Sequence, residues 1–198
     1  MERFILEVPG AISEADCATL IEEFGKSAHA EVAEVGIERL VDRNVRDCEH
    51  VPITNCPDKG LASFDKVFFD SSCDGYNEYA AKILAPEGVL LSFNSFRQVH
   101  FQMIRYQPGS KGYGWHHDEM LRSEGVRTLS FIWYLNTLPE DHGTEFKYFD
   151  RIIKPEAGKL LIFPSNWCWQ HRGLPAKQDK YIVTSWLVGG ITTNNSAV

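Results

Sequence analysis

Apolar residues in the first part of the chain recur at the spacing of an α-helix. They do so in ISEADCATLIEEF, residues 12–24, with Ser13 in the position of an N-cap. Asp16 takes the capping-box position, where Glu or Gln is usual. A short apolar run over residues 3–8 precedes this segment and is separated from it by a Pro-Gly pair. The pattern therefore predicts a short strand followed by an amphipathic helix.

A second helix is predicted over residues 62–84, where aromatic and aliphatic residues form one apolar face. Gly75 lies inside this helix as a candidate interruption, and the sequence Pro-Glu-Gly at residues 86–88 ends it. Residues 29–60, between the two helices, are poorly patterned. We expect this segment to be irregular and to end in a loop around residues 52–57.

After residue 96 the pattern changes to short strands separated by turn sequences such as PGSKG and LPEDHG. The strands are expected at about 97–106, 112–118, 127–135, 144–149, 159–163, 167–171 and 180–188. The segment RTLSFIWYLN, residues 127–136, is almost continuously apolar, which predicts a central strand buried on both faces. Helices followed by many short strands predict a mainly β protein of the α+β class, a barrel or sandwich with helices packed on one face.

The length and composition fit one globular domain. With 198 residues, of which 43% are hydrophobic and 24% charged, the chain is long enough to bury a sizeable core. We therefore expect a single domain over residues 1–198, with helical support in residues 1–95 and the β-structure in residues 96–190. The tail TTNNSAV is the part expected to be loose.

Charge and cysteine content narrow the expected partners and compartment. The formal net charge of −7 argues against a nucleic-acid partner, because phosphate binding relies on clustered Lys and Arg. The 5 cysteines have irregular spacing and no C-x-x-C pair, which predicts reduced thiols in the cytoplasm. The chain shows no secretory signal pattern and no apolar stretch approaching the ~20 residues of a membrane helix, so no membrane partner is expected. The oligomeric state is not indicated.

The stretch GWHHDEM, residues 114–120, contains two overlapping candidates for a metal site. His116 pairs with Asp118, and His117 pairs with Glu119, each two residues apart. On an extended chain such residues point to the same face, so an imidazole and a carboxylate can approach one ion together. Two histidines and one carboxylate, with other positions left open, suit a non-haem Fe(II) site. The alternative is a polar loop without a metal.

A third ligand must come from elsewhere in the chain. The candidates are His29, His50, His100, His142 and His171. His171 differs from the others because it follows the apolar strand KLLIFP and precedes a strand that begins with the basic residue Lys180. The intervening strands can bring His171 back to the first pair, and Lys180 can bind an anionic co-substrate. The pattern therefore favours His171 as the third ligand.

From about residue 97 to residue 188, the sequence resembles the iron- and 2-oxoglutarate-dependent dioxygenases. Within them it is similar to the prolyl 4-hydroxylase group, including small phage-encoded members. The resemblance depends on blocks that follow one another in order: MIRYQPGSKGYGWHHD, RTLSFIWYLN, GTEF, KLLIFPSNWCWQHRGLP and DKYIVTSWL. The fold that it implies is a double-stranded β-helix, or jelly roll, with the N-terminal helices supporting one sheet.

The resemblance also selects one of the two overlapping pairs. In the family pattern a tyrosine stands some ten residues before the ligating histidine and an acid follows two residues later, as Tyr106 and Asp118 do around His116. It implies that His116, Asp118 and His171 bind Fe(II). His117 then points to the opposite face, because a shift of one residue on a strand reverses every side chain.

The resemblance implies 2-oxoglutarate and O2 as co-substrates, with ascorbate supporting the activity. Lys180 matches the basic residue that pairs with the distal carboxylate of 2-oxoglutarate. Such a cation is needed because the keto-acid end of the molecule chelates the iron. Tyr106 and Thr144 are the expected hydrogen-bonding partners of the co-substrate. From the residues alone, an ordinary strand-end lysine and an ordinary strand tyrosine are the alternatives.

Arg127 and Trp186 match positions that lie towards the substrate in prolyl hydroxylases. They imply that Arg127 holds a peptide carbonyl and that Trp186 packs on a pyrrolidine ring, the alternatives being a surface arginine and a core tryptophan. The expected reaction is hydroxylation of a prolyl residue in a protein or peptide, with release of succinate and CO2. The other functions weighed are hydroxylation of a free amino acid or another small molecule, and a jelly-roll binding module without metal chemistry. Nucleic-acid demethylation is less favoured, since no second arginine closely follows Lys180.

Two features depart from the family pattern. Trp115 is larger than the residue usual before the metal-binding block, which predicts a differently shaped entry to the iron. Residues 29–60 match nothing in the family. In the prolyl 4-hydroxylase group such segments often cover the active site and select the substrate, and we expect the same here.

Overall fold

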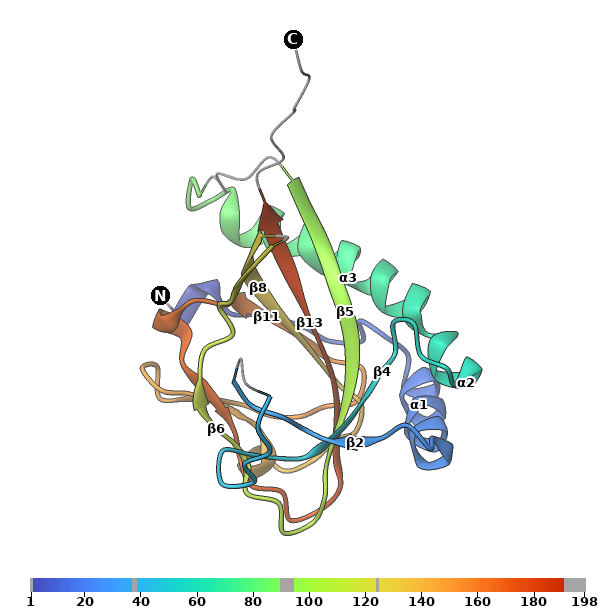
Figure 1. Cartoon of the computed structure of the whole chain (residues 1–198). Helices are drawn as coiled ribbons and strands as arrows, with labels where there is room; N and C mark the ends of the chain where they lie inside the picture. The colour runs from blue at the N-terminus through green and yellow to red at the C-terminus, as the bar shows by residue number, and fades with distance from the viewer. Residues whose placement is uncertain (1, 37–38, 90–94, 124, 191–198) are drawn as a thin grey trace.

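The computed structural model describes residues 2–36, 39–89, 95–123 and 125–190, whose strands form two antiparallel sheets that face each other (Figure 1). The larger sheet contains β1 (Leu6–Val8), β2 (Glu31–Val32), β4 (Glu49–Pro52), β5 (Ser95–Tyr106), β7 (Leu121–Arg122), β8 (Gly125–Tyr134), β11 (Leu160–Pro164) and β13 (Lys180–Gly190). The smaller sheet contains β3 (Arg46–Asp47), β6 (Gly112–His116), β9 (Thr144–Phe146), β10 (Arg151–Ile153) and β12 (His171–Gly173).

The strand order places β8 inside the larger sheet. This sheet has the order β1-β11-β8-β13-β5-β4-β2, with β7 also paired to β8, and the smaller sheet has the order β10-β9-β12-β6-β3. In the register of β8, Ile132 lies opposite Leu161 of β11 and Trp133 lies opposite Val183 of β13. The central strand predicted over residues 127–136 is therefore confirmed.

Alternate residues of β8 enter two different cores. Phe131 and Trp133 belong to the apolar cluster beneath the helices, whereas Ile132 and Tyr134 belong to the cluster between the two sheets. Successive side chains of a strand point to opposite faces of its sheet. Both faces of β8 are covered, which is why the segment is apolar at almost every position.

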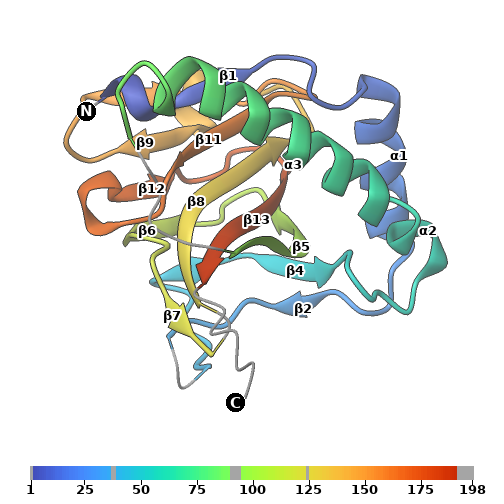
Figure 2. The same ribbon diagram turned by 90° about the horizontal axis from the view of Figure 1, so that it is seen from above.

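The helices α1 (Glu14–Lys26), α2 (Lys59–Ala62) and α3 (Asp65–Tyr79) lie against the outer face of the larger sheet (Figure 2). Phe68 of α3 packs on Phe101 and Trp133, with ring centroids 5.7 and 5.2 Å away. The indole N–H of Trp133 donates to Ser71 Oγ at 2.9 Å. The expected architecture, mainly β with helices supporting one sheet, is confirmed. None of the described helices is long and apolar enough to cross a membrane.

The second predicted helix is divided, but not at Gly75. It consists of α2, then α3, then a π-helical turn at Ala80–Leu84. Gly75 lies within α3, and a Cβ atom at this position would be 2.6 Å from Leu160 Cδ2. The glycine therefore allows α3 to pack closely on β11, at the cost of some helix propensity.

The poorly patterned residues 29–60 contain more regular structure than expected. They supply β2 and β4 to the larger sheet and β3 to the smaller one, so residues 1–95 contribute strands as well as helices. These strands have only two to four residues each. An alternation of apolar and polar residues cannot be recognised over so short a run.

The C-terminal strands also differ from expectation in detail. The strand predicted over residues 167–171 begins as a 3-10 turn at Trp167–Trp169, and β12 starts only at His171. The short strands β7 and β10 were not predicted. The tail at residues 192–198 lies outside the described residues.

The N-cap predicted for the first helix is present, and its removal should weaken the protein measurably. The N–H of Asp16 donates to Ser13 Oγ at 3.0 Å. Replacing Ser13 by alanine leaves this helix N–H without a side-chain acceptor, so we expect the free energy of unfolding to fall by about 1 kcal/mol. Urea titration measures the change, and Ser13→Asp, which restores an acceptor, should recover most of it.

Candidate metal centre

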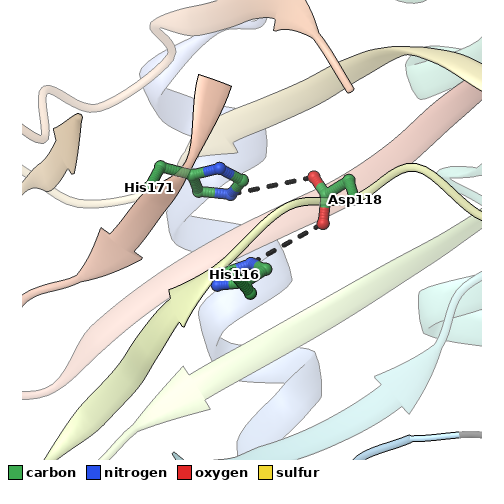
Figure 3. A group of neighbouring side chains, drawn as sticks. All are labelled: His116, Asp118 and His171. Atoms are coloured by element: carbon green, nitrogen blue, oxygen red, sulfur yellow. Dashed lines mark ion pairs between the residues drawn. The ribbon is translucent and has the colours of Figure 1, made fainter. Parts of the chain in front are cut away.

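Antiparallel pairing brings two histidines from distant parts of the chain face to face. His116 ends β6, His171 begins β12, and the two residues are direct cross-strand partners. Asp118 follows β6, with its Oδ1 3.6 Å from His116 Nε2 and its Oδ2 3.8 Å from His171 Nε2 (Figure 3). One ligand atom from each residue lies within 4.8 Å of the others, so the three side chains can hold a metal ion.

Backbone carbonyls fix which nitrogen of each imidazole is available. Nδ1 of His116 is 2.8 Å from the carbonyl oxygen of Gly114, and Nδ1 of His171 is 3.0 Å from that of Trp169. A carbonyl only accepts, so each Nδ1 carries the hydrogen and each Nε2 keeps a lone pair. In both histidines the nitrogen with the lone pair is the one nearest Asp118. This Nδ1–H tautomer is the one that two metal ligands require here.

The Asp118 carboxylate is held by its own set of contacts. Ser130 Oγ of β8 donates to Asp118 Oδ2 at 2.7 Å and lies 2.9 Å from Ser165 Oγ. The carbonyl oxygen of Ser165 accepts hydrogen bonds from the N–H groups of Asp118 and Glu119, at 3.0 and 2.8 Å. These contacts fix both the side chain and the backbone of Asp118 before a metal ion binds. Less conformational entropy is therefore lost on binding.

Burial and the neighbouring ligands shift the pKa values of His116 and Asp118. Burial and the neighbouring His171 lower the pKa of His116, so its imidazole is neutral near pH 7. Burial raises the pKa of Asp118, but His171, His116 and hydrogen bonds from Ser130 and Trp186 outweigh this and bring the pKa below its ordinary value. The centre thus presents neutral His116 and ionised Asp118, the protonation states in which these side chains bind metals.

The two overlapping pairs of the GWHHDEM stretch differ in their exposure to solvent. His116 and Asp118 line a cavity between the sheets, whereas His117 and Glu119 are exposed. The alternation follows from the extended backbone, which points successive side chains to opposite sides. The structure thus brings the His116 and Asp118 pair to His171 and leaves the shifted pair outside.

A single cavity of about 630 Å³ contains every residue that the sequence nominated for the site. These residues are Tyr106, His116, Asp118, Arg127, Thr144, His171, Lys180 and Trp186. They come from both sheets, since β5, β8 and β13 belong to the larger sheet and β6, β9 and β12 to the smaller one. The cavity is large enough for a small dicarboxylic acid together with part of a second molecule.

Lys180 is a buried cation without an acidic partner among the described residues. Lys180 is the first residue of β13 and is only 2% exposed. Nζ donates to the carbonyl oxygens of His142 and Leu174, at 3.0 and 3.2 Å, and lies 4.5 Å from the centre of the Tyr106 ring. Burial lowers the pKa of Lys180 to about 8. An ammonium group has three donors, so one N–H is left for a ligand.

Hydroxyl groups line the end of the cavity that contains Lys180. Thr144 Oγ1 accepts a hydrogen bond from the hydroxyl of Tyr134 at 2.8 Å, and both residues line the cavity. Tyr106 lies directly opposite Lys180 in the pairing of β5 with β13. Tyr134 was not nominated from the sequence, because it looked like another apolar residue of the central strand.

At the metal side of the cavity, Arg127 and Trp186 form a stacked pair. The guanidinium carbon of Arg127 lies 3.6 Å from the centre of the Trp186 ring. The Trp186 side chain also hydrogen-bonds Asp118. The pair therefore adjoins the metal centre, with one face of the indole covered by the guanidinium group.

The remaining histidines and Trp115 lie away from the metal centre. His29 Nε2 lies 3.7 Å from Asp58 Oδ1 and His142 Nδ1 lies 2.8 Å from Asp141 Oδ1, while His50 and His100 line the cavity without joining the centre. The expectation that Trp115 reshapes the entry is not met, because its ring is 40% exposed and does not line the cavity. It packs instead against the guanidinium group of Arg172, 4.6 Å away.

The donor set matches one kind of metal. Two imidazole nitrogens and one carboxylate oxygen on one side of an ion, with the other positions facing a cavity, are typical of non-haem Fe(II) sites. A structural Zn²⁺ site would require a fourth protein ligand. Among the described residues, the only grouping of metal-binding side chains is these three. The residues present therefore fit Fe(II) with open coordination positions.

Removing the Ser130 hydroxyl should weaken metal binding without touching a ligand. Ser130→Ala removes the hydrogen bond to Asp118 Oδ2 and leaves the bond from Trp186 to orient the carboxylate, and changes of this kind typically cost about 10- to 100-fold in metal affinity. We expect such a loss for Fe(II), measured by calorimetry without oxygen. The matched control is Ser72→Ala, which removes another buried serine hydroxyl, one bonded to the Phe69 carbonyl of α3. Equal Fe(II) affinity in Ser130→Ala and the wild type would show that this hydrogen bond does not position the ligand.

Comparisons with known proteins agree with this geometry. Residues 101–188 match the family model of the 2OG-Fe(II) oxygenase superfamily. A PKHD-type hydroxylase of Synechococcus sp. (strain CC9902) is 33% identical over 82 residues, which are 39% of this chain and 37% of that protein. The chain therefore matches well under half of the length of this curated relative.

Solved structures share the fold over almost the whole chain. A prolyl hydroxylase from Trichoplax adhaerens, in complex with a hypoxia inducible factor peptide, has a TM-score of 0.72, 18% identity, and coverage of 94% of this chain and 84% of its own. The viral collagen prolyl hydroxylase of Paramecium Bursaria Chlorella virus-1, in its 2OG complex, has a TM-score of 0.66, 19% identity, and coverage of 95% and 97%. Together with the two facing sheets, these similarities confirm the jelly-roll fold.

Proposed function

We propose that this chain, whose residues 101–188 belong to the 2OG-Fe(II) oxygenase superfamily, is a dioxygenase that hydroxylates a prolyl residue in a protein or peptide. The cofactors of the superfamily are Fe(II) and 2-oxoglutarate, and the residues of the cavity fit both. The observation that carries the proposal is that the histidines and aspartate, the buried Lys180 and the Arg127–Trp186 pair all line one cavity.

In the proposed enzyme, His116, Asp118 and His171 hold the iron. When bound, Fe(II) together with 2-oxoglutarate and O2 supplies the oxidising power, with release of succinate and CO2. The protein keeps the two imidazoles in the Nδ1–H tautomer through the carbonyls of Gly114 and Trp169. Ser130 donates a hydrogen bond to Oδ2 of Asp118, which would hold the carboxylate in place beside the two imidazoles.

Lys180 is proposed to bind the distal carboxylate of 2-oxoglutarate. It supplies a buried positive charge and a spare N–H, and a buried charge is stabilised strongly by a carboxylate. The Thr144 hydroxyl accepts a hydrogen bond from Tyr134 and keeps its own hydrogen for the same carboxylate, and Tyr106 excludes water by covering the ammonium group. These groups hold the co-substrate in one orientation, so that its keto-acid end lies towards the metal ligands.

Arg127 and Trp186 are proposed to receive the prime substrate. The exposed part of the indole is an apolar surface on which a pyrrolidine ring can pack, and the guanidinium group has donors for a peptide carbonyl. The fold shared with prolyl hydroxylases, one of them solved with a peptide, supports a peptide substrate.

Mass spectrometry tests the substrate. Proline-containing peptides are incubated with the protein, Fe(II), 2-oxoglutarate, ascorbate and O2, and analysed for an oxygen atom added to proline together with succinate. The proposal expects both products, and neither from His171→Ala. Turnover of another class of compound, such as a free amino acid, with no oxygen added to any prolyl peptide, would contradict the prolyl substrate.

The pKa of Lys180 makes a separate prediction about pH. Since burial lowers this pKa to about 8, the side chain is mostly charged at pH 7 and mostly neutral at pH 9. Only the charged form pairs with a carboxylate, so the Kd for 2-oxoglutarate should rise about tenfold from pH 7 to pH 9. The adjacent Tyr106 and Cys48 have pKa values raised by burial and stay neutral over most of this range.

Calorimetry at several pH values measures this change. The control ligand is 2-oxobutanoate, which has the keto-acid end but no distal carboxylate, and its Kd should not follow the titration of Lys180. A parallel rise for both ligands would assign the pH dependence to the metal centre instead.

A further inference from the structure

A second cation, half-buried and with a buried Nε atom, lies close to the metal centre on the segment that the sequence left without a pattern. Arg46 of β3 is the cross-strand partner of Tyr113 of β6, and its guanidinium carbon lies 5.1 Å from the centre of the Tyr113 ring. The Tyr113 ring stacks on His116, with centroids 3.6 Å apart. All three residues line the cavity. A fixed positive charge is therefore separated from a metal ligand by one aromatic ring.

This charge has no carboxylate partner within the described ranges of the chain. The Nη1 group of Arg46 donates to the carbonyl oxygen of Glu34 at 3.3 Å, and Nε is buried without any partner. Its polar neighbours include the Cys48 thiol, whose pKa burial raises, so the thiol contributes no charge. By contrast, Arg43 on the same segment is exposed and ion-paired with Asp47 at 2.7 Å. A guanidinium group with a buried and unused donor is costly unless an anion binds it.

The Tyr113 hydroxyl adds a second donor at this place. Among the described residues it has no hydrogen-bond partner, while the ring is fixed between Arg46 and His116. A phenol hydroxyl carries one O–H donor, so the Tyr113 side chain can donate to an anion. The charges that act on this hydroxyl are the positive charge of Arg46, which acts most strongly, the negative charge of Asp118 and the positive charge of Arg127.

We propose that Arg46 and Tyr113 form a carboxylate-binding subsite, so that the compound oxidised here carries a carboxylate close to the oxidised carbon. This inference rests on the proposed function and deepens it, because it gives the prime substrate a charge. Lys180, which lies beside Tyr106 and Thr144, serves the distal carboxylate of 2-oxoglutarate, so Arg46 is left for a different anion. The carboxylate is either the carboxyl group of the proline itself or the side chain of an acidic residue next to it.

Two pairs of probes, matched in shape and different in charge, test the subsite. N-acetyl-L-proline is compared with N-acetyl-L-prolinamide, and acetyl-Pro-Asp-amide with acetyl-Pro-Asn-amide. Binding to the protein loaded with Fe(II) and 2-oxoglutarate is measured by calorimetry without oxygen. The carboxylate member of one pair should bind at least about tenfold more tightly than its amide, as expected for a charge-assisted hydrogen bond. The pair that shows the difference identifies the source of the carboxylate.

Variants of this segment assign the preference to Arg46. Arg46→Gln should reduce the preference to less than about twofold, whereas Arg43→Gln, on the same segment but ion-paired at the surface, should keep it. Arg46→Lys retains the positive charge without the planar, two-donor guanidinium group, so it should keep part of the preference for the carboxylate probe. The Kd for 2-oxoglutarate should be unchanged in all three variants, which also shows that they are folded.

Three results would overturn the subsite. The first is that neither carboxylate probe binds the wild type more tightly than its amide. The second is that the preference survives Arg46→Gln. The third is that Arg46→Gln weakens 2-oxoglutarate binding, which would assign Arg46 to the co-substrate. Failure of the proposed function is distinct from all of these, since no prolyl peptide would then gain an oxygen atom, whether another class of compound is turned over or no succinate is formed at all.

Discussion

Replacing His116 by alanine is expected to abolish Fe(II) binding, while replacing the adjacent His117 is expected to leave it intact. His116 lies opposite His171 and presents Nε2 towards Asp118, whereas His117 is exposed. Losing the hydrogen-bonding partner of a ligand already costs about 10- to 100-fold in metal affinity, so losing the ligand itself should cost more than about 100-fold. Iron retained after anaerobic loading and desalting measures the effect.

The neighbouring histidine makes this comparison well controlled. His117→Ala removes an imidazole from the same stretch, so it reproduces any general effect on the local backbone. Fe(II) content close to that of the wild type in His117→Ala, and close to zero in His116→Ala, is the expected result. If His117→Ala alone lost iron, the register of the whole GWHHDEM stretch would be wrong.

Replacing Lys180 by methionine is expected to raise the Kd for 2-oxoglutarate by at least about 30-fold. Removing one partner of a buried, hydrogen-bonded charge pair costs about 2 kcal/mol or more, and 1.4 kcal/mol corresponds to a factor of ten. Methionine is close to lysine in length and keeps the contact with the Tyr106 ring. The change therefore removes the charge and the N–H donors while retaining most of the packing.

Comparison of two ligands isolates the part that depends on the charge. Wild-type protein and Lys180→Met are titrated with 2-oxoglutarate and with 2-oxobutanoate, which lacks the distal carboxylate. The substitution should weaken the first ligand strongly and the second by less than about threefold, because only the first has a group for Lys180 to bind. Equal losses for both ligands would show that the substitution disturbs the cavity rather than a specific ion pair.

Local patterns in the sequence were sufficient for the central strand of the larger sheet and for the shared face of His116 and Asp118. The segment RTLSFIWYLN predicts a strand buried on both faces, and β8 is covered by the helices on one side and by the smaller sheet on the other. The spacing of His116 and Asp118 predicts two side chains on one face. The exposed positions of His117 and Glu119, which alternate with them, agree with this prediction. These inferences work because the period of a strand depends on its own backbone alone.

Other parts of the site depend on contacts between distant segments and were not predictable. Ser130 is one polar residue in an apolar strand, and its role appears only when Asp118 and Ser165 are brought beside it. Arg46 lies in residues 29–60, where the strands are too short to show a pattern. Its importance comes from the pairing of β3 with β6, which places it on Tyr113. Nothing in the neighbouring residues encodes such a pairing.

The lack of a partner for a charge is likewise a property of the whole fold. Lys180 and Arg43 are both basic residues near an aspartate in the sequence, at Asp179 and Asp47. In the structure Arg43 pairs with its aspartate, whereas Asp179 pairs with Arg105 at 2.8 Å and Lys180 points into the cavity. Only the alternation of β13 separates Asp179 from Lys180, and the sequence does not show which of them faces inwards.

The measurement that tests the account most directly is the visible absorption of the protein mixed with Fe(II) and 2-oxoglutarate in the absence of oxygen. If His116, Asp118 and His171 hold iron and the cavity binds the co-substrate, the wild type will develop the charge-transfer band of the iron–2-oxoglutarate chelate. His117→Ala should develop the same band, and His116→Ala should not. A folded wild-type protein that develops no band at saturating Fe(II) and 2-oxoglutarate would contradict the assignment as a 2-oxoglutarate-dependent dioxygenase.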